Sequence, residues 1–284
     1  MNSIELNADL HCHSTASDGL LSPTDVVRRA AANGVELLAL TDHDELVGLA
    51  EARAEAGRLG LRFVSGAEFS VSWGDQTVHI VGLDFDETEP SLVEGLRQVR
   101  AGRDARAKLI AEDLARIGIR GAFEGALRYV GNPALISRSH FARYLVEIGI
   151  SREVSEVFDH YLVRGKPGFV EHEWASLEEV LGWIHGAGGI AVIAHPARTR
   201  VAKPDLARLF ERFKSLGGEA IEVVSGVQAG PFAREYARVA RRYGFLASRG
   251  SDFHGPGESA VDLGQAERLP RDLTPVWESL RQVV

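Results

Sequence analysis

The sequence predicts an α/β fold with a mainly parallel sheet, and two observations support this prediction. Short apolar runs typical of buried strands alternate with helix-length segments along most of the 284-residue chain. Histidine or acidic residues also follow directly after several of these runs. In a (β/α) barrel the carboxyl ends of the strands form one rim, where the active site lies. Together, the two patterns predict a barrel with a polar rim.

The predicted strands begin near the amino terminus. Segment 9–13 is short and apolar, and in a strand residues two apart share a face. His11 and His13 should therefore converge, while Cys12 faces the opposite side and is expected in the core. Five further runs are typical of buried strands, at 36–41, 62–67, 190–194, 220–224 and 245–248.

Two helices have recognisable ends. Ser22 followed by Pro23 indicates an N-cap and a first helical residue, and this helix should run to about Gly34. Ser176 and Glu179 have the spacing of a capping box, which predicts a helix to about residue 189. A different pattern occupies segment 68–85, where residues alternate around residues 74 and 75 and predict a hairpin.

The rhythm of strands stops between residues 90 and 168, where the sequence becomes helical and rich in arginine. We interpret this segment as a helical insertion, or lid, between two parts of a barrel at 1–89 and 169–284. Four arginines recur at steps of three, so that only two or three of them could meet one ligand. They are Arg97, Arg100, Arg103 and Arg106, and solvated faces are expected for the first two.

Composition limits the function. With 45% hydrophobic residues the chain can bury a large core, and a single cysteine excludes a disulfide framework and fits a reducing, cytoplasmic setting. No apolar run approaches the roughly 20 residues that span a bilayer, and residues 1–5 lack the start of an export signal. The net charge of -8 disfavours a general nucleic-acid surface. We therefore expect neither a membrane partner nor stable DNA binding.

Nine imidazole and carboxylate side chains form one candidate metal-binding set, and five of them follow predicted strands. A single histidine or aspartate after a strand is more often a cap or a core residue, so the inference depends on the whole set. Such ligands without thiolate are typical of zinc, manganese or iron sites, and nine exceed what one four-coordinate ion uses. We expect two or three ions. The set is His11, His13, Asp18, His43, Glu68, His79, His195, Asp252 and His254.

Other polar residues receive lesser roles. Asp42 and Asp44 flank His43, and we expect them to orient ligands or to cap a helix. The four histidines outside the set are expected on the surface or in packing roles; they are His140, His160, His172 and His185.

Six motifs, in their order along the chain, resemble the PHP (polymerase and histidinol phosphatase) family of metal-dependent phosphoesterases. The resemblance covers nearly the whole chain. It implies a distorted seven-stranded (β/α) barrel with up to three divalent ions, commonly manganese, iron or zinc. The motifs are Asp9-Leu10-His11-Cys12-His13-Ser14, Ser17-Asp18-Gly19, Thr41-Asp42-His43-Asp44, Gly66-Ala67-Glu68, Ala194-His195-Pro196 and Gly250-Ser251-Asp252-Phe253-His254.

Segments 137–143, 157–162 and 188–196 are similar to one branch of this family, which carries a helical insertion. That branch includes RNase AM and the nucleoside 3',5'-bisphosphate phosphatases. The resemblance implies a phosphatase that removes the 3'-phosphate of a nucleoside 3',5'-bisphosphate and leaves the 5'-monophosphate. We expect Mn²⁺ as the ion, with zinc or iron as alternatives.

The expected chemistry depends on the ions, which lower the pKa of a bound water and neutralise phosphate oxygens. Glu68 is the expected bridging ligand, and no catalytic side chain beyond the ligands is assigned. Guanidinium groups bind phosphate bidentately, so arginines of the insertion and of the barrel rim are candidates for the second phosphate. The candidate substrate-binding residues are Arg103, Arg106, Ser137, Arg138 and Arg198.

Three alternatives remain open. A 5'-to-3' exoribonuclease acting on short RNA would use the same ions on a phosphodiester. Histidinol-phosphate phosphatase is disfavoured, because an arginine-bearing insertion suits a second phosphate better than an amino alcohol. A non-catalytic metal-binding or regulatory module belongs to another class of protein, and the presence of all nine candidate ligands argues against it.

Overall fold

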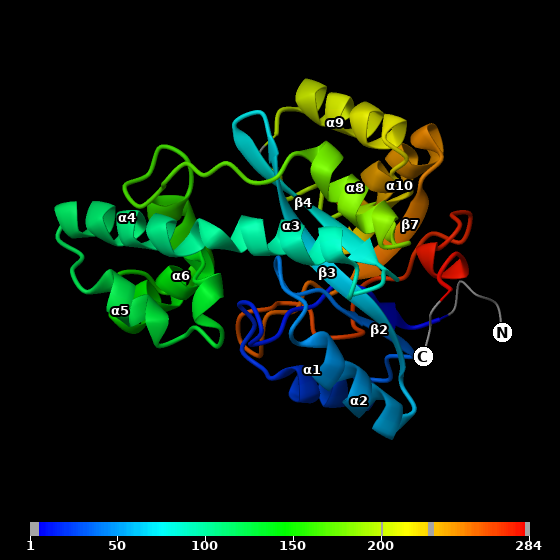
Figure 1. The fold of residues 1–284 in the computed structure, drawn as a ribbon, viewed down its shortest axis with the longest axis horizontal. Coiled ribbons are helices and arrows are strands. Elements are labelled where there is room, and N and C mark those ends of the chain that lie inside the picture. Colours follow the sequence, from blue (N-terminus) through cyan, green and yellow to red (C-terminus); the bar gives the residue numbers. More distant parts are fainter. Residues whose placement is uncertain (1–5, 200, 227–229, 282–284) are drawn as a thin grey trace.

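A single sheet of seven strands curls into a nearly closed barrel at the centre of the described chain (Figure 1). In this computed structural model the described residues are 6–199, 201–226 and 230–281, so residues 1–5, used above for the export-signal expectation, lie outside them. The strands follow one another in chain order. They are β1 (Ala8–Asp9), β2 (Leu37–Leu40), β3 (Arg62–Trp73), β4 (Gln76–Leu83), β5 (Ile190–Ile193), β6 (Ala220–Ser225) and β7 (Leu246–Gly250).

The barrel closes where the first strand meets the last. The N–H of Leu10 donates to the carbonyl of Arg249 at 3.1 Å, and Cys12 forms a bridge with Phe253. Regular pairing in β1 covers only Ala8–Asp9, so the predicted strand at 9–13 continues as irregular backbone. The predicted α/β barrel is confirmed.

One strand departs from the parallel arrangement. The predicted hairpin is present, because β3 and β4 pair antiparallel around residues 74 and 75, and β4 also pairs antiparallel with β5. A two-residue connection can join only antiparallel neighbours, whereas the other pairs are parallel. The run predicted at 62–67 and the first arm of the hairpin are one strand of 12 residues.

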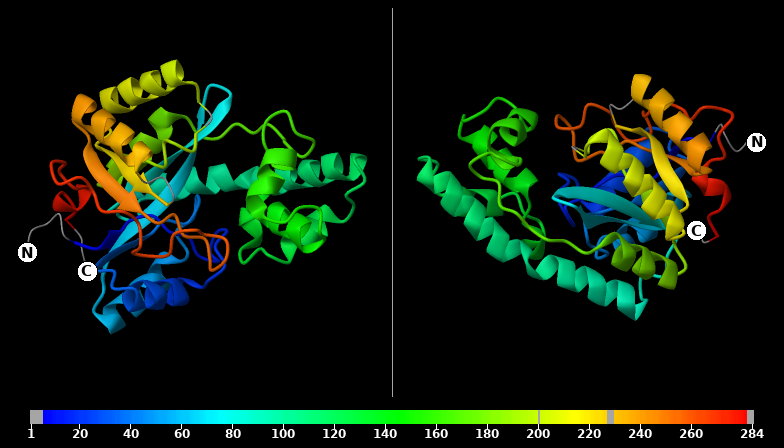
Figure 2. Two further views of the ribbon diagram at one scale, coloured as in Figure 1. Left: turned by 180° about the vertical axis from the view of Figure 1, so that it is seen from behind. Right: turned by 90° about the horizontal axis from the view of Figure 1, so that it is seen from above.

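Helices cover the outside of the barrel (Figure 2). The predicted start at Ser22 is confirmed, since its side chain accepts a hydrogen bond from the N–H of Asp25, and so is the capping box of Ser176 and Glu179. No helix in the described ranges combines the length and apolarity needed to cross a membrane. These barrel helices are α1 (Pro23–Ala32), α2 (Leu49–Leu59), α8 (Leu177–Gly186), α9 (Lys203–Ser215) and α10 (Pro231–Tyr243), and a short 3-10 turn, η4 (Val276–Glu278), follows β7.

The helices between β4 and α8 form an insertion, most of which projects from the barrel (Figure 2). Its helical elements are α3 (Pro90–Ala101), α4 (Arg103–Arg116), α5 (Ala122–Leu127), η2 (Pro133–Leu135), α6 (Arg138–Glu147), α7 (Val154–Val157) and the π-helical turn η3 (Phe158–Leu162). Residues from Ala107 to Leu162 bury a second apolar cluster of their own. In contrast, α3 packs on the barrel, because Leu92 and Leu96 join the main core.

Candidate metal centre

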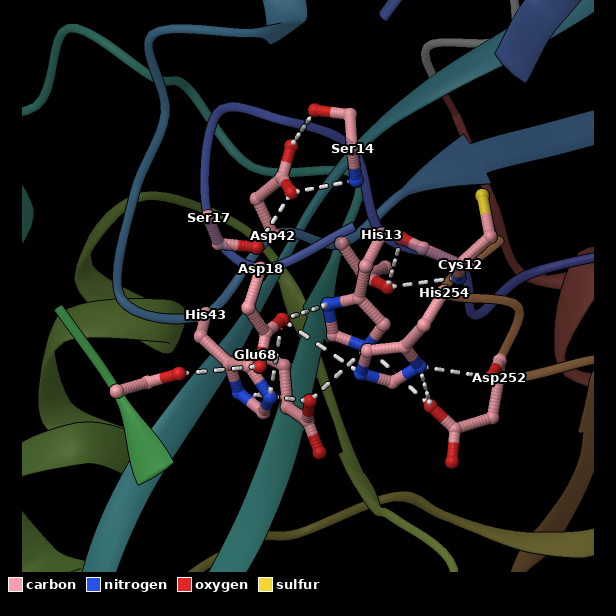
Figure 3. A network of polar contacts seen from close by, with 12 residues as sticks. Cys12, His13, Ser14, Ser17, Asp18, Asp42, His43, Glu68, Asp252 and His254 are labelled. Atoms are coloured by element: carbon pink, nitrogen blue, oxygen red, sulfur yellow. Dashed lines mark hydrogen bonds and ion pairs between the residues drawn. The ribbon is translucent and has the colours of Figure 1, made fainter. Parts of the chain in front are cut away.

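All nine candidate ligands converge at one end of the barrel, and six of them are labelled in Figure 3. His11 and His13 come from the chain after β1, His43 follows β2, and His195 follows β5. The other ligands reach the same place by different routes. Asp18 lies in the loop before α1, Glu68 and His79 lie within β3 and β4, and Asp252 and His254 follow β7.

Glu68 lies at the centre of the group and is fully buried. Its Oε1 is 2.8 Å from Nδ1 of His79 and 2.7 Å from Nε2 of His195. The second oxygen faces other imidazoles: Oε2 lies 3.3 Å from Nε2 of both His11 and His13, and 2.9 Å from Nδ1 of His43. Each oxygen of Glu68 therefore lies beside a different set of histidines. A carboxylate that bridges two ions needs such an arrangement, because each oxygen then shares its ion with its own histidines.

Two aspartates complete the group. Oδ1 of Asp18 lies 3.5 Å from Nε2 of His254 and 3.8 Å from Nε2 of His43. Oδ1 of Asp252 lies 3.3 Å from Nε2 of His13, and its other oxygen pairs with Arg198. The two carboxylates lie near different nitrogens of His13, because Oδ1 of Asp18 is 3.9 Å from Nδ1 and Oδ1 of Asp252 is on the Nε2 side.

Unpaired polar atoms within the group indicate, independently of the sequence pattern, that these side chains fit divalent ions. His13 Nδ1, Asp18 Oδ1 and Glu68 Oε2 are buried without a hydrogen-bond partner, an arrangement that proteins otherwise avoid. Ligand atoms within 4.8 Å of one another form four overlapping groups. These groups are His13, Asp18, His43 and His254; His11, Glu68 and His195; His11, His13 and Asp252; and His43, Glu68 and His79.

The buried carboxylates and imidazoles of the group shift the pKa values of one another. Burial alone would raise the pKa of Glu68, but His43, His79 and other imidazoles outweigh it and hold that pKa well below its usual value. Burial and the neighbouring His254 and His43 lower the pKa of His13 to about 3, so this ring is neutral at pH 7. Burial opposes protonation of His43, but the carboxylates of Glu68 and Asp18 outweigh it and raise the pKa of that ring to about 9. Ionised carboxylates and neutral imidazole are the forms that bind divalent ions, so an ion bound at His43 would have to displace its proton.

Buried carboxylates behind the ligands hold their loops. Asp42 accepts hydrogen bonds from the N–H of Ser14 at 2.8 Å and from the hydroxyls of Ser14 and Ser17, both at 2.6 Å. These bonds shape the loop that carries Asp18 (Figure 3). Asp44 accepts from the N–H and the hydroxyl of Ser70, both at 2.8 Å. Asp42 thus holds the loop of a candidate ligand, whereas the side chain of Asp44 contacts Ser70 and Arg103, which are not candidate ligands.

Glu222 on β6 contacts two candidate ligands, and sequence reasoning missed it. Its Oε1 lies 2.6 Å from Nδ1 of His11, and its Oε2 accepts a hydrogen bond from the backbone N–H of His195 at 2.6 Å. The available signal was a single charged residue inside the apolar run 220–224.

The backbone is strained at the rim. Four residues other than glycine have positive φ in the described chain, and three of them belong to the rim: Asp44 at 49°, His195 at 24° and Asp252 at 51°. Left-handed backbone costs about 1 kcal/mol or more outside glycine and clusters at functional sites.

A cavity of about 1680 Å³ extends from the candidate ligands to the helical insertion. Arg106 and Arg138 line it from the insertion, and Arg198 lines it from the barrel rim. Arg103 has another place, because it is buried, pairs with Asp44 and lies over the ring of Trp174 at 4.7 Å.

Ser137, the remaining substrate-binding candidate, caps α6 instead of lining the cavity. Its hydroxyl lies 3.1 Å from Nδ1 of His140 and 3.5 Å from Oδ2 of Asp18. His140 is fully buried, so the packing role expected for it matches its position.

The arginines between insertion and cavity lie close together. Burial, and then the charges of Arg138 and Arg103, lower the pKa of Arg106 to about 9. The Nε of Arg106 donates to the carbonyl of Val170 at 3.2 Å, and its guanidinium lies over Trp174 at 5.3 Å. Arg100, expected on a solvated face, instead donates to the carbonyl of Asp44, whereas Arg97 is exposed and pairs with Glu94.

Comparisons with known proteins agree with the geometry. The model of the PHP domain matches residues 9–185. A 3',5'-nucleoside bisphosphate phosphatase of Chromobacterium violaceum is 52% identical over 96% of each chain, and a 5'-3' exoribonuclease of Haemophilus influenzae is 42% identical over 95% of this chain and 97% of its own. A solved structure described as an amidohydrolase from Chromobacterium violaceum with bound sulfate superposes with a TM-score of 0.93, at 51% identity over 96% of this chain and 95% of that one.

Proposed function

The chain belongs to the PHP family, and from that premise we propose that it is a metal-dependent phosphatase that removes the 3'-phosphate from nucleoside 3',5'-bisphosphates. One observation carries the proposal. Six of the nine candidate ligands, Glu68 among them, line the same cavity as Arg106 and Arg138. One cavity thus offers both a candidate metal centre and separate guanidinium groups to a substrate with two phosphates. The relative from Chromobacterium violaceum is named for this activity, and its similarity extends over 96% of the chain, which supports the same substrate here.

We propose that two or three divalent ions bind at the nine ligands, since the four groups share members and cannot all be filled separately. Mn²⁺ is the proposed ion, with zinc or iron as alternatives. When bound, such ions supply a water of lowered pKa and neutralise the oxygens of the phosphate. Glu68 would hold two ions through its two oxygens, and the neutral histidines keep the centre positively charged for an anionic substrate.

The arginines of the insertion would bind the phosphate that is not cleaved. Arg106 is crowded by Arg103 and Arg138, and a bound phosphate would relieve this repulsion. Arg103 already pairs with Asp44, so we do not propose it as a phosphate-binding residue, and Arg106 and Arg138 remain the candidates from the insertion. Arg198 is proposed to contact substrate at the rim, beside its partner Asp252.

A second candidate activity is 5'-to-3' exoribonuclease action on short RNA. The cavity of about 1680 Å³ exceeds the roughly 300–1,000 Å³ that small-molecule sites occupy, so it has room for more than one nucleotide. The relative from Haemophilus influenzae is named for this activity. A non-catalytic module remains disfavoured because no candidate ligand is missing from the group. We propose the cytoplasm as the compartment, on the composition alone, and no stable binding of DNA.

The test is a comparison of substrates with the intact protein in buffer containing Mn²⁺. Release of inorganic phosphate is measured from a nucleoside 3',5'-bisphosphate and from histidinol phosphate. Release of nucleoside 5'-monophosphates is measured from a 5'-phosphorylated RNA of a few nucleotides, by separation of the products. We expect the largest kcat/KM for the bisphosphate, with the 5'-monophosphate as product, and loss of turnover after chelation. A larger kcat/KM for RNA would favour the exoribonuclease, and turnover that survives complete chelation would contradict both activities.

A further inference from the structure

We propose that Glu222 is a positioning residue that orients two of the candidate metal ligands, His11 and His195, and thereby sets the affinity of one ion. It lies on β6, a strand that contributes none of the nine ligands. The proposal rests on the metal centre of the proposed function, and it concerns the ion that His11, Glu68 and His195 would hold together.

The geometry of Glu222 is unusually complete for a side chain that is not a ligand. It is buried, with 2% of its surface exposed. Oε1 lies 2.6 Å from Nδ1 of His11, and Oε2 accepts the backbone N–H of His195 at 2.6 Å. The pairing of β6 with β7 shifts register between Glu222 and Val224, and such bulges re-aim side chains beside active sites. One carboxylate thus joins the chain after β1 to the chain after β5.

Both partners of this carboxylate must donate. The backbone N–H of His195 has no other role than that of a donor. His11 directs Nε2 toward the group, 3.3 Å from Oε2 of Glu68 and 3.6 Å from Oδ1 of Asp252. A metal ligand presents a lone pair, so Nδ1 of His11 carries the proton and its N–H donates a hydrogen bond to Oε1 of Glu222. Only a carboxylate offers an acceptor oxygen to each of two donors in these positions.

The hydrogen bond from His195 to Glu222 also stabilises strained backbone at His195. His195 has a φ of 24°, and the hydrogen bond from its N–H fixes the residue in that conformation. With the backbone fixed and Nε2 of His195 at 2.7 Å from Oε1 of Glu68, the ring has a defined direction. Glu222 therefore holds one ligand through its ring and the other through its main chain.

The effect should be local within the metal centre. His11 and His195 share a group with Glu68, whereas His13, Asp18, His43 and His254 form a group that includes neither partner of Glu222. Loss of the Glu222 carboxylate should lower the affinity of the first group for its ion and leave the affinity of the second group unchanged. A residue needed only for folding would not separate the two groups.

The test compares Glu222→Gln with a matched control, Glu219→Gln. Glutamine has the shape of glutamate but one acceptor oxygen, so one of the two donors would face an NH₂ group. Glu219 lies just before β6 and accepts from the N–H of Ala191 at 3.0 Å and lies 3.2 Å from His185, neither of which is a candidate ligand. For each protein we would measure Mn²⁺ content and affinity by chelator competition, the unfolding midpoint without metal, and the ¹⁵N shifts of the histidine rings.

We expect Glu222→Gln to bind the ion of the group His11, Glu68 and His195 about ten- to a hundredfold more weakly, with a changed tautomer signal for His11. An ion held by His13, Asp18, His43 and His254 should keep its wild-type affinity, and Glu219→Gln should match the wild type at every ion. Equal affinity for every ion, or a uniform loss at all of them, would overturn the proposal. If Glu222→Gln does not fold, Glu222→Asp decides, because its shorter side chain cannot keep both 2.6 Å contacts and should weaken the same ion. A wild-type protein that binds no Mn²⁺ would instead overturn the metal centre of the proposed function.

Discussion

The barrel rim and the helical insertion differ in which charged side chains they present and in what supports those side chains. At the rim, histidines and carboxylates converge from the ends and edges of strands, and buried groups such as Glu222 and Asp42 hold them from behind. The insertion presents arginines on helices that pack on a second apolar cluster. The proposed chemistry therefore depends on side chains fixed to the barrel sheet, whereas the proposed recognition depends on a layer with its own core.

A few polar ties join the two regions. Arg103 of the insertion pairs with Asp44 of the rim, and Arg143 donates to the carbonyl of Asp18 and pairs with Glu258 at 2.6 Å. Asn132 donates to Glu45 at 3.0 Å. Because Arg103 and Arg143 contact residues beside or within the candidate ligand set, movement of the insertion would be felt at the metal centre.

The largest expected effect comes from breaking the rim at its centre. Glu68→Ala removes the carboxylate that faces five histidines, and metal ions contribute several kcal/mol to stabilising the transition state. We expect kcat to fall on the order of a thousandfold and the bound Mn²⁺ to decrease, as measured by phosphate release and metal analysis. Glu94→Ala, an exposed change on α3, is the control. Near wild-type turnover in Glu68→Ala would contradict the proposed ligand set.

A smaller effect should follow when the insertion is altered and the rim is left intact. Arg106→Ala with Arg138→Ala removes two guanidinium groups from the cavity wall, and a charge-assisted bidentate contact contributes about 1.5–3 kcal/mol. We expect kcat/KM for a 3',5'-bisphosphate to fall about a hundredfold relative to that for a 3'-monophosphate, with unchanged metal content.

Arg97→Ala is the control for these arginines, because Arg97 lies on the same insertion but is exposed and paired with Glu94. An equal loss for both substrates would show that Arg106 and Arg138 do not recognise the second phosphate.

The smallest expected effect concerns the stability of the insertion at low pH. Burial, and then the charges of Arg143 and Arg103, lower the pKa of His140 to about 4, from 6.5 when the chain is unfolded. A lowered pKa means that its contribution to stability is complete above pH 6.5 and is lost as the pH falls toward 4. Between pH 7 and pH 5 the loss is roughly 2 kcal/mol.

Hydrogen exchange of the amides in α6 measures this loss. His140→Asn keeps an acceptor for the N–H of Ser137, which bonds Nδ1 at 2.9 Å, and should flatten the dependence on pH. His160→Asn, an exposed change in the same layer, should retain the wild-type dependence. If wild type and His140→Asn lose protection equally between pH 7 and pH 5, the assignment to His140 is wrong.

The sequence predicted the rim well because its signals are local. A polar residue directly after an apolar run, as at His43 and His195, indicates a strand end, and strand ends in a barrel meet. The same reasoning could not identify Glu222, whose partner His11 lies 211 residues away and is brought near only by closure of the barrel. Local patterns do not record contacts of that kind.

The insertion was harder to predict because its arginines are equivalent in sequence. Steps of three give Arg103 and Arg106 the same pattern, yet one is buried against Asp44 and the other lines the cavity. The difference depends on how α4 is placed over Trp174. Likewise, α3 packs on the barrel because Gly95 lets Trp183 of α8 approach, a contact across 88 residues that no periodicity shows.

The positive φ angles at Asp44, His195 and Asp252 have a consequence for the evolution of this enzyme. Glycine would relax each position and make the fold more heat-resistant, by up to about 1 kcal/mol per site. At His195 and Asp252, however, the same substitution deletes a candidate ligand. Selection for thermal tolerance alone would therefore drive these positions away from catalysis, and a heat-adapted form of the enzyme should gain its stability elsewhere, in the helices around the barrel or in the second core.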